Sequence, residues 1–291
     1  MVRGRFAPTP SGPLHMGSLV AALASYLDAR RRGGLWLVRI EDVDTTRCKI
    51  EFEKAILLEL ERHGLFWDGQ VVRQSKRSEF YVDALSTLAH QNFLYSCSCT
   101  RLSLQHRGCE FNAQGELVYP GFCRPKSVAG GRGRALSSGF AERFLVEMGD
   151  FEFLDEIAGF QFGSVAKDVG DFVVRRADGC FSYHLAVVVD DFLQGINRVV
   201  RGADILPLTG RHMVLQRALG FAHPQYAHIP LVFGEDGRKL SKSDSARALS
   251  ETSAPENLKQ ALAHLGVPIR LSDHASIDDI LRFAQMHYTL S

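Results

Sequence analysis

The 291-residue sequence has no long hydrophobic run and no excess of charge of either sign. No apolar run reaches the roughly 18 residues that a membrane-spanning helix needs, and the opening MVRGRFAPTP lacks the apolar stretch of a signal peptide. Basic residues number 34 and acidic residues 33, so the net charge argues neither for nor against a nucleic-acid partner. We expect a cytoplasmic protein, without a membrane partner, and a monomer.

Cysteines are also scarce, because six in a chain of this length are too few for a disulfide scaffold. Three of them, Cys97, Cys99 and Cys123, fall close together, which in a reducing compartment indicates a metal before a disulfide. Tetrahedral zinc needs a fourth ligand, and Cys109 and His106 are nearby candidates. The alternative is a group of unligated thiols.

The start of the chain has the pattern of a strand, a helix and a second strand. Val2–Ala7 predicts a short strand that ends at Pro8, because proline cannot donate to a sheet. Apolar residues recur at helical spacing over Ser18–Arg32, and Leu35–Ile40 is an apolar run of strand length. We expect a βαβ unit whose functional turn lies at the carboxyl edge of a parallel sheet.

The rest of the chain continues this α/β pattern around one irregular region. A cysteine-bearing, glycine-rich stretch from Ser96 to about Gly133 indicates an insertion. Ser253-Ala254-Pro255-Glu256 forms a capping box that predicts a helix after it. Further helices are expected over Lys49–Arg62, Ser78–His90 and Thr209–Leu219, and further buried strands over Leu185–Val189 and Ile196–Arg201.

Two short motifs carry chemistry, and the first is RFAPTPSGPLHMGS, which begins at Arg5. It places His15 and small residues at a strand-to-helix turn, where backbone N–H groups and the positive end of a helix suit a phosphate. The stretch does not match G-x-x-x-x-G-K-[ST], so an ordinary P-loop is excluded. Taken alone, a histidine such as His15 is more often a helix-capping or structural residue.

The second motif is KLSKS, at Lys239–Ser243. Two ammonium groups and several hydroxyl or backbone donors on one loop suit the charge that develops on a leaving phosphate. A lysine-serine loop is also a common solvated surface feature, so this motif is weak by itself.

Together, His15-Met16-Gly17-Ser18 and KLSKS resemble the paired "HIGH" and "KMSKS" signatures of class I aminoacyl-tRNA synthetases. The surrounding RFAPTPSGPLHMGS, LVRIEDVDTTR and VVRGADIL are similar to the glutamyl and glutaminyl branch of that class. The resemblance covers about Arg3 to Ser250, and the sequence ends at Ser291 without the anticodon-reading domains of ordinary glutamyl-tRNA synthetases. It therefore resembles the truncated family that esterifies glutamate onto queuosine in tRNA(Asp).

The resemblance implies an ATP-dependent activation of L-glutamate to glutamyl-adenylate. Glutamate would then pass to the queuosine base in the anticodon of tRNA(Asp), with Mg²⁺ accompanying the ATP and one structural Zn²⁺ per chain. Two alternatives stay open: a truncated glutamyl-tRNA synthetase that charges a tRNA 3′ end, and a catalytically inactive RNA-binding paralogue.

The resemblance also implies a set of residues for glutamate. A planar guanidinium such as that of Arg5 suits a carboxylate, and Glu41 at a strand end can accept from the substrate ammonium. Glu41 could otherwise be a capping or surface residue, and Arg201 could pair with Asp190 or Asp191 for structural reasons. The implied glutamate-binding residues are Arg5, Phe6, Ala7, Pro8, Thr9, Glu41, Tyr183 and Arg201.

Catalysis is assigned by the same resemblance to His15 and Lys242. The implied ATP-binding residues are His15, Gly17, Ser18, Lys239 and Lys242. For zinc, the family uses C-x-C followed by Y-x-x-x-C, and YPGFC matches the second part. The implied ligands are Cys97, Cys99, Tyr119 and Cys123, with Tyr119 in place of Cys109 or His106.

The expected fold is an α/β class I synthetase fold, in which a zinc-bearing insertion splits a Rossmann-like parallel sheet. Residues 1–95 would form the first half of the catalytic domain and residues 96–165 the insertion with the zinc site. Residues 166–235 would form the second half, and residues 236–291 the KMSKS-type loop with a short helical C-terminal segment.

Overall fold

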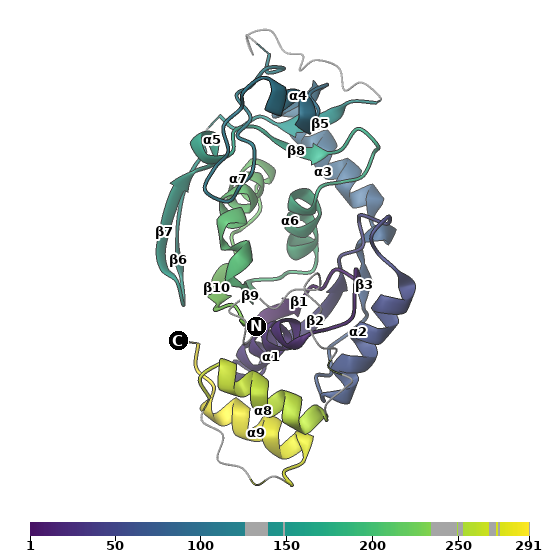
Figure 1. The fold of residues 1–291 in the computed structure, drawn as a ribbon, viewed down its shortest axis with the longest axis vertical. Coiled ribbons are helices and arrows are strands. Elements are labelled where there is room, and N and C mark those ends of the chain that lie inside the picture. Colours follow the sequence, from purple (N-terminus) through teal and green to yellow (C-terminus); the bar gives the residue numbers. More distant parts are fainter. Residues whose placement is uncertain are drawn as a thin grey trace.

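The computed structural model describes residues 1–125, 139–147, 149–233, 249, 253–267, 272 and 274–290 (Figure 1). The chain begins with the expected βαβ unit, in which β1 (Arg3–Phe6) leads through α1 (Met16–Arg31) to β2 (Leu35–Ile40). β1 and β2 pair in parallel, with Arg5 opposite Leu37. The expected strands, helix and pairing are confirmed.

The strand order reverses at β1. β2 pairs on its other side with β3 (Val72–Arg73), and a second sheet has the order β7-β6-β10-β9. That sheet contains β6 (Asp150–Asp155), β7 (Gly159–Ser164), β9 (Arg198–Gly202) and β10 (Gln225–Ile229). Just before β9, the Asn197 N–H donates to the Arg3 carbonyl at 3.2 Å, and the Arg3 N–H donates to Asn197 Oδ1 at 2.9 Å. β1 therefore lies between β2 and β9, and such a reversal point is where open α/β sheets bind ligands.

The two faces of the β1–β2 pair differ in character. Trp36, Val38 and Ile40 alternate along β2 and are fully buried with α1 in one hydrophobic core. That core also contains residues of α8 (Ala254–His264) and α9 (Ile277–His287), which lie beside α1 in Figure 1. Arg39 points to the opposite face, because alternate residues of a strand do so. One face is thus apolar and the other carries charge.

Most of the expected helices are present with nearly the expected bounds. They are α2 (Ile50–Arg62), α3 (Ser78–His90) and α7 (Thr209–Leu219). Gly220 ends α7 in the left-handed region, with φ 71°, a conformation that glycine adopts without a Cβ penalty. Ser253 caps α8 by accepting from the Glu256 N–H, which confirms the capping box.

The expected strand over Leu185–Val189 is wrong. These residues lie inside α6 (Tyr183–Leu193), whose start is capped by Ser182, because the Ser182 hydroxyl accepts from the Leu185 N–H. α6 is buried on most sides, so its residues read as one continuous apolar run. Such a run does not distinguish a buried strand from a buried helix. The next expected strand, over Ile196–Arg201, is confirmed as β9.

The cysteine-bearing region builds on a separate small sheet. β4 (Leu94–Cys97), β5 (Ala141–Phe144) and β8 (Phe172–Arg175) are antiparallel neighbours, and α4 (Arg101–His106) and α5 (Val165–Asp168) lie close by in Figure 1. α6 and α7 separate this sheet from the parallel strands. β4 begins before residue 96 and β8 follows residue 165, so the small sheet extends past both ends of the expected 96–165 segment.

Two short 3₁₀ helices complete the described elements, η1 (Gln74–Lys76) before α3 and η2 (Ala203–Leu208) after β9. Of the described helices, none combines the length and the hydropathy needed to cross a membrane.

Candidate active site

A cavity of about 520 Å³ lies at the carboxyl ends of β1, β2 and β9, where the strand order reverses. It is lined by all eight residues that the family resemblance implies for glutamate, namely Arg5, Phe6, Ala7, Pro8, Thr9, Glu41, Tyr183 and Arg201. His15, Gly17 and Ser18, expected at the ATP, line the same cavity. Lys239 and Lys242 lie outside the described residues.

The amino end of α1 faces this cavity. His15 is the residue before the first helical turn, with extended backbone and no side-chain capping bond, and the first turn contains no acidic residue. Its Nε2 lies 3.0 Å from Ser18 Oγ. The first backbone N–H groups of a helix have no partner within the helix and carry partial positive charge. This end of the cavity therefore suits a phosphate.

Beside the cavity lies a buried group of two arginines and two carboxylates, Arg5, Arg39, Glu41 and Asp191, which we call the charge cluster. Asp191 Oδ1 accepts from Arg5 Nε at 3.1 Å and from Arg39 Nη1 at 2.7 Å. Arg39 Nη2 donates to Glu41 Oε1 at 3.2 Å. Arg39 is completely buried, a costly position for a charge unless carboxylates surround it.

Burial and the neighbouring charges set the protonation of this cluster. Burial raises the pKa of Glu41, although Arg39 and Arg5 oppose the effect. Burial acts in the same direction on Asp191, but Arg5 and Arg39 outweigh it and hold its pKa below the usual value. Burial and the charge of Glu41 raise the pKa of Tyr183 to about 12. Tyr183 is thus a neutral phenol at the cavity, whereas Asp191 is ionised.

Arg201 reaches the cavity from the end of β9 and is held by neutral partners. Its Nε donates to His228 Nε2 at 2.9 Å, and its Nη2 donates to Thr209 Oγ1 at 2.9 Å. His228 accepts through Nε2, so its Nδ1 carries the proton and donates to Asp155 Oδ2 at 2.5 Å. Within the described residues Arg201 forms no salt bridge, so the alternative of a structural pair with Asp190 or Asp191 is not found.

The histidines around Arg201 are neutral. Burial lowers the pKa of His228, His212 and His184, and the nearby Arg201 lowers it further. The pKa of His184 falls to about 4. Neutral rings leave the positive charge of Arg201 without direct compensation among the described residues, so it is available to an anionic group in the cavity.

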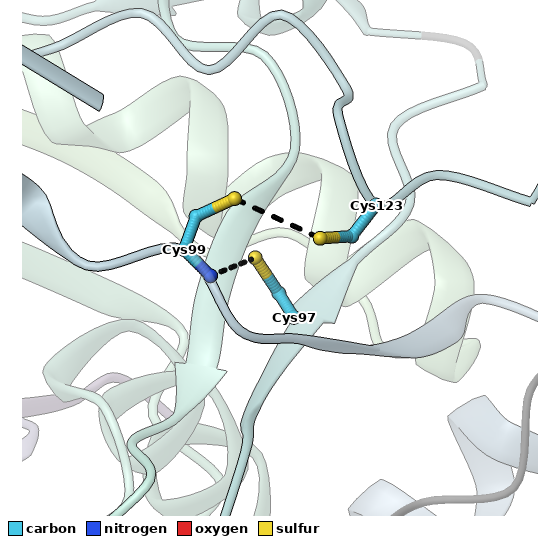
Figure 2. Close-up of side chains that lie close together, drawn as sticks. All are labelled: Cys97, Cys99 and Cys123. Carbon is cyan, nitrogen blue, oxygen red and sulfur yellow. Dashed lines mark hydrogen bonds between the residues drawn. The ribbon is translucent and has the colours of Figure 1, made fainter. Parts of the chain in front are cut away.

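The three expected cysteines lie together (Figure 2). Cys97 is the last residue of β4, Cys99 follows it by two residues, and Cys123 comes from a later segment. Their Sγ atoms lie within 4.8 Å of one another, and Cys99 Sγ is 3.7 Å from Cys123 Sγ. A zinc tetrahedron with Zn–S bonds of about 2.3 Å has S···S edges of about 3.8 Å, so the spacing fits zinc. Cys109 and His106 are not in this group among the described residues.

Tyr119 lies against the same thiols. Its hydroxyl accepts from the Cys123 backbone N–H at 2.8 Å and is 3.5 Å from Cys97 Sγ. Burial opposes ionisation of Cys123, but hydrogen bonds from the Ser98 backbone and Tyr119 outweigh it and lower its pKa to about 7. The three sulfurs and this oxygen are compatible with four ligands around one zinc ion.

The sequence did not single out every residue that shapes the cavity. Arg39 was missed inside the apolar run LWLVRI, where a charge in a buried strand, two residues before Glu41, was the available signal. His228 and Thr209 were missed because their roles depend on the packing of β10 and α7 against Arg201. Asp191 was considered only as a partner of Arg201, and it pairs with Arg5 and Arg39 instead.

The Asp155–His228 pair generates a pH prediction. Burial would raise the pKa of Asp155, but the bond from His228 and backbone donors outweigh burial and lower it from 3.8 to about 2. A depressed folded pKa stabilises the protein above the unfolded pKa, and that stabilisation is lost as the pH falls toward 2. Between about pH 5 and pH 3, the wild type should lose about 1 kcal/mol more unfolding free energy than Asp155→Asn.

Urea unfolding at the two pH values measures this difference. Asp150→Asn is the matched control, because Asp150 lies at the exposed end of the same strand and should keep the wild-type pH dependence. An Asp155→Asn protein that loses as much stability as the wild type over this range would contradict the interpretation.

Comparison with known proteins agrees with the resemblance that the sequence motifs carry. Residues 1–274 match the family model described as tRNA synthetases class I (E and Q), catalytic domain. A glutamyl-Q tRNA(Asp) synthetase from Dechloromonas aromatica (strain RCB) is 48% identical over 289 residues, covering 99% of this chain and 94% of the relative. One from Thiobacillus denitrificans (strain ATCC 25259 / T1) is 49% identical over 265 residues, covering 91% and 85%.

A solved structure shares the architecture. The crystal structure of glutamate-tRNA synthetase from Elizabethkingia anophelis matches with a TM-score of 0.79 and 26% identity. The match covers 99% of this chain and 66% of that chain. The parallel sheet and its helices are therefore the class I synthetase catalytic fold. The chain belongs to the catalytic-domain family of class I tRNA synthetases for E and Q, among the glutamyl-Q tRNA(Asp) synthetases.

Proposed function

We propose that this chain activates L-glutamate with ATP to glutamyl-adenylate and transfers the glutamate to the queuosine base in the anticodon of tRNA(Asp). The observation that carries the proposal is the cavity, because it combines two arginines and a carboxylate with the amino end of α1. The name shared by the curated relatives supports the choice of tRNA and of acceptor base.

Glutamate has two carboxylates and one ammonium, and the cavity offers a partner for each. We assign the carboxylates to the guanidinium groups of Arg5 and Arg201, since a planar guanidinium binds a carboxylate through two parallel hydrogen bonds. Glu41 accepts from the ammonium, and the neutral phenol of Tyr183 adds a hydrogen-bond donor. Phe6, Ala7, Pro8 and Thr9 complete the wall between these groups.

Activation is the attack of the glutamate α-carboxylate on the α-phosphate of ATP, which forms glutamyl-adenylate and releases pyrophosphate. The nucleophile is already ionised, so the step needs no general base. The protein positions the reactants and stabilises charge, with His15, Gly17 and Ser18 at the phosphates. We assign the departing pyrophosphate to Lys239 and Lys242 of KLSKS. Mg²⁺ accompanies the ATP, held mainly by phosphate oxygens and water.

We also propose that the cysteine cluster holds one structural zinc through Cys97, Cys99, Cys123 and Tyr119. The sulfur spacing and the position of the Tyr119 hydroxyl support this ligand set. A bound zinc would stabilise the region around β4 by joining segments far apart in the sequence.

The division of the chain into residues 1–95, 96–165, 166–235 and 236–291 remains our proposal for its domain organisation. A monomer in the cytoplasm is likewise part of the proposal.

The acceptor atom is tested by labelling. The protein is incubated with ATP, radiolabelled glutamate and tRNA(Asp), either with or without queuosine and with the 3′-terminal adenosine either present or removed. We expect label only on the queuosine-containing tRNA and equally on both kinds of 3′ end, because the esterified hydroxyl belongs to the modified base.

Label that disappears when the 3′-terminal adenosine is removed would contradict the proposal. It would instead favour the alternative of a glutamyl-tRNA synthetase that charges a tRNA 3′ end.

The zinc ligands are tested by metal analysis of purified variants. We expect about one zinc per chain in the wild type, and less in Tyr119→Phe because the variant lacks the fourth ligand. Cys109→Ser is the matched control and should keep its zinc, since Cys109 lies outside the cluster of thiols. Zinc loss in Cys109→Ser alone would exclude Tyr119 as the ligand.

A further inference from the structure

Within the charge cluster, Asp191 links Arg5 to Arg39, and Arg39 in turn links Asp191 to Glu41. Asp191 Oδ1 accepts from Arg5 Nε at 3.1 Å and from Arg39 Nη1 at 2.7 Å. Arg39 in turn donates to Glu41, and a second donor bond from its Nη1 reaches Gln194 Oε1 at 2.8 Å. Arg5 and Glu41 line the cavity, whereas Asp191 and Arg39 do not.

The strand geometry explains why these groups meet. Arg5 on β1 is opposite Leu37 on β2. Leu37 and Arg39 lie on the same face of that strand, and Glu41 comes directly after its last residue. Asp191 belongs to α6, on the charged side of the sheet. The three ion pairs of the charge cluster are buried, since no side chain in them is more than 9% exposed.

The orientation of Arg5 follows from this arrangement. Its Nε is occupied by Asp191, so its terminal Nη nitrogens are the part of the guanidinium left for a ligand in the cavity. Glu41 is held in the same way, because Arg39 occupies one carboxylate oxygen, Oε1. Neither the Arg5 nor the Glu41 side chain therefore has to change conformation when a ligand that carries a carboxylate and an ammonium enters the cavity.

We propose that Asp191 and Arg39 are positioning residues that fix Arg5 and Glu41 as one unit for binding the carboxylate and ammonium of glutamate. This inference rests on the proposed function, because it takes glutamate as the ligand. His15, Tyr183, Arg201 and Asp204 also line the cavity that this unit faces, and Asp190 Oδ2 lies 4.0 Å from Arg39 Nε.

The test is glutamate-dependent ATP–pyrophosphate exchange by Asp191→Asn, Arg39→Gln and the double variant. Asp191→Asn keeps the shape of the side chain but removes the charge that holds both arginines. We expect each single variant to raise the KM for glutamate about tenfold and to leave the KM for ATP within about twofold, because only glutamate binding uses Arg5 and Glu41. The KM of the double variant for glutamate should not exceed that of the more impaired single variant, since both changes disrupt one unit.

A matched buried pair serves as the control. Asp28 on α1 accepts from Arg198 Nε at 2.6 Å and from its Nη2 at 3.0 Å, both side chains are buried, and neither lines the cavity. Asp28→Asn should lower the thermal unfolding midpoint as a broken buried pair does, without changing the KM for glutamate. Arg39→Lys keeps a positive charge and should recover part of the lost glutamate affinity.

The outcomes separate two failures. A wild-type protein without glutamate-dependent exchange would overturn the proposed function and this inference together. Normal exchange by the wild type, with Asp191→Asn and Arg39→Gln that keep the wild-type KM for glutamate, would overturn the positioning role alone. Equal changes in the KM for glutamate and for ATP, matched by Asp28→Asn, would also overturn it, because they would show a general loss of structure.

Discussion

Asp191 is a buried carboxylate that holds two arginines at the point where the strand order of the sheet reverses. An isolated charge in such a place would cost several kcal/mol of unfolding free energy, so the carboxylate and the guanidinium groups depend on one another. Arg39, fully buried within β2, joins this pair to Glu41. The polarity of the cavity, with a cationic and an anionic group side by side, depends on that arrangement.

The surrounding fold separates apolar packing from charge. Trp36, Val38 and Ile40 place one face of β2 against α1 in the main core, and Trp36 Nε1 donates to Ser25 Oγ at 2.9 Å. The opposite face carries Arg39 and receives α6. Because α1 packs on the apolar side but begins at the carboxyl edge, its positive amino end and the charged face of the sheet open into one cavity.

Local patterns in the sequence predicted the first βαβ unit and several helices, whereas the resemblance to class I synthetases implied the residues around the cavity. Arg5 and Glu41 could be found because they lie in motifs that resemble the glutamyl branch and stand at or next to strand ends. Leu185–Val189 could not be assigned correctly, since a helix buried on most sides has no amphipathic period. The partners of Arg201 could not be predicted either, because His228 and Thr209 reach it only through the packing of β10 and α7.

The central claim is that fixed opposite charges in this cavity select glutamate. The most direct measurement compares glutamate with glutamine, which has nearly the same shape but one charge fewer, in ATP–pyrophosphate exchange. The account predicts that kcat/KM for glutamate exceeds that for glutamine by about tenfold or more, because glutamine leaves a buried guanidinium without a carboxylate. Equal values of kcat/KM for the two amino acids would contradict it.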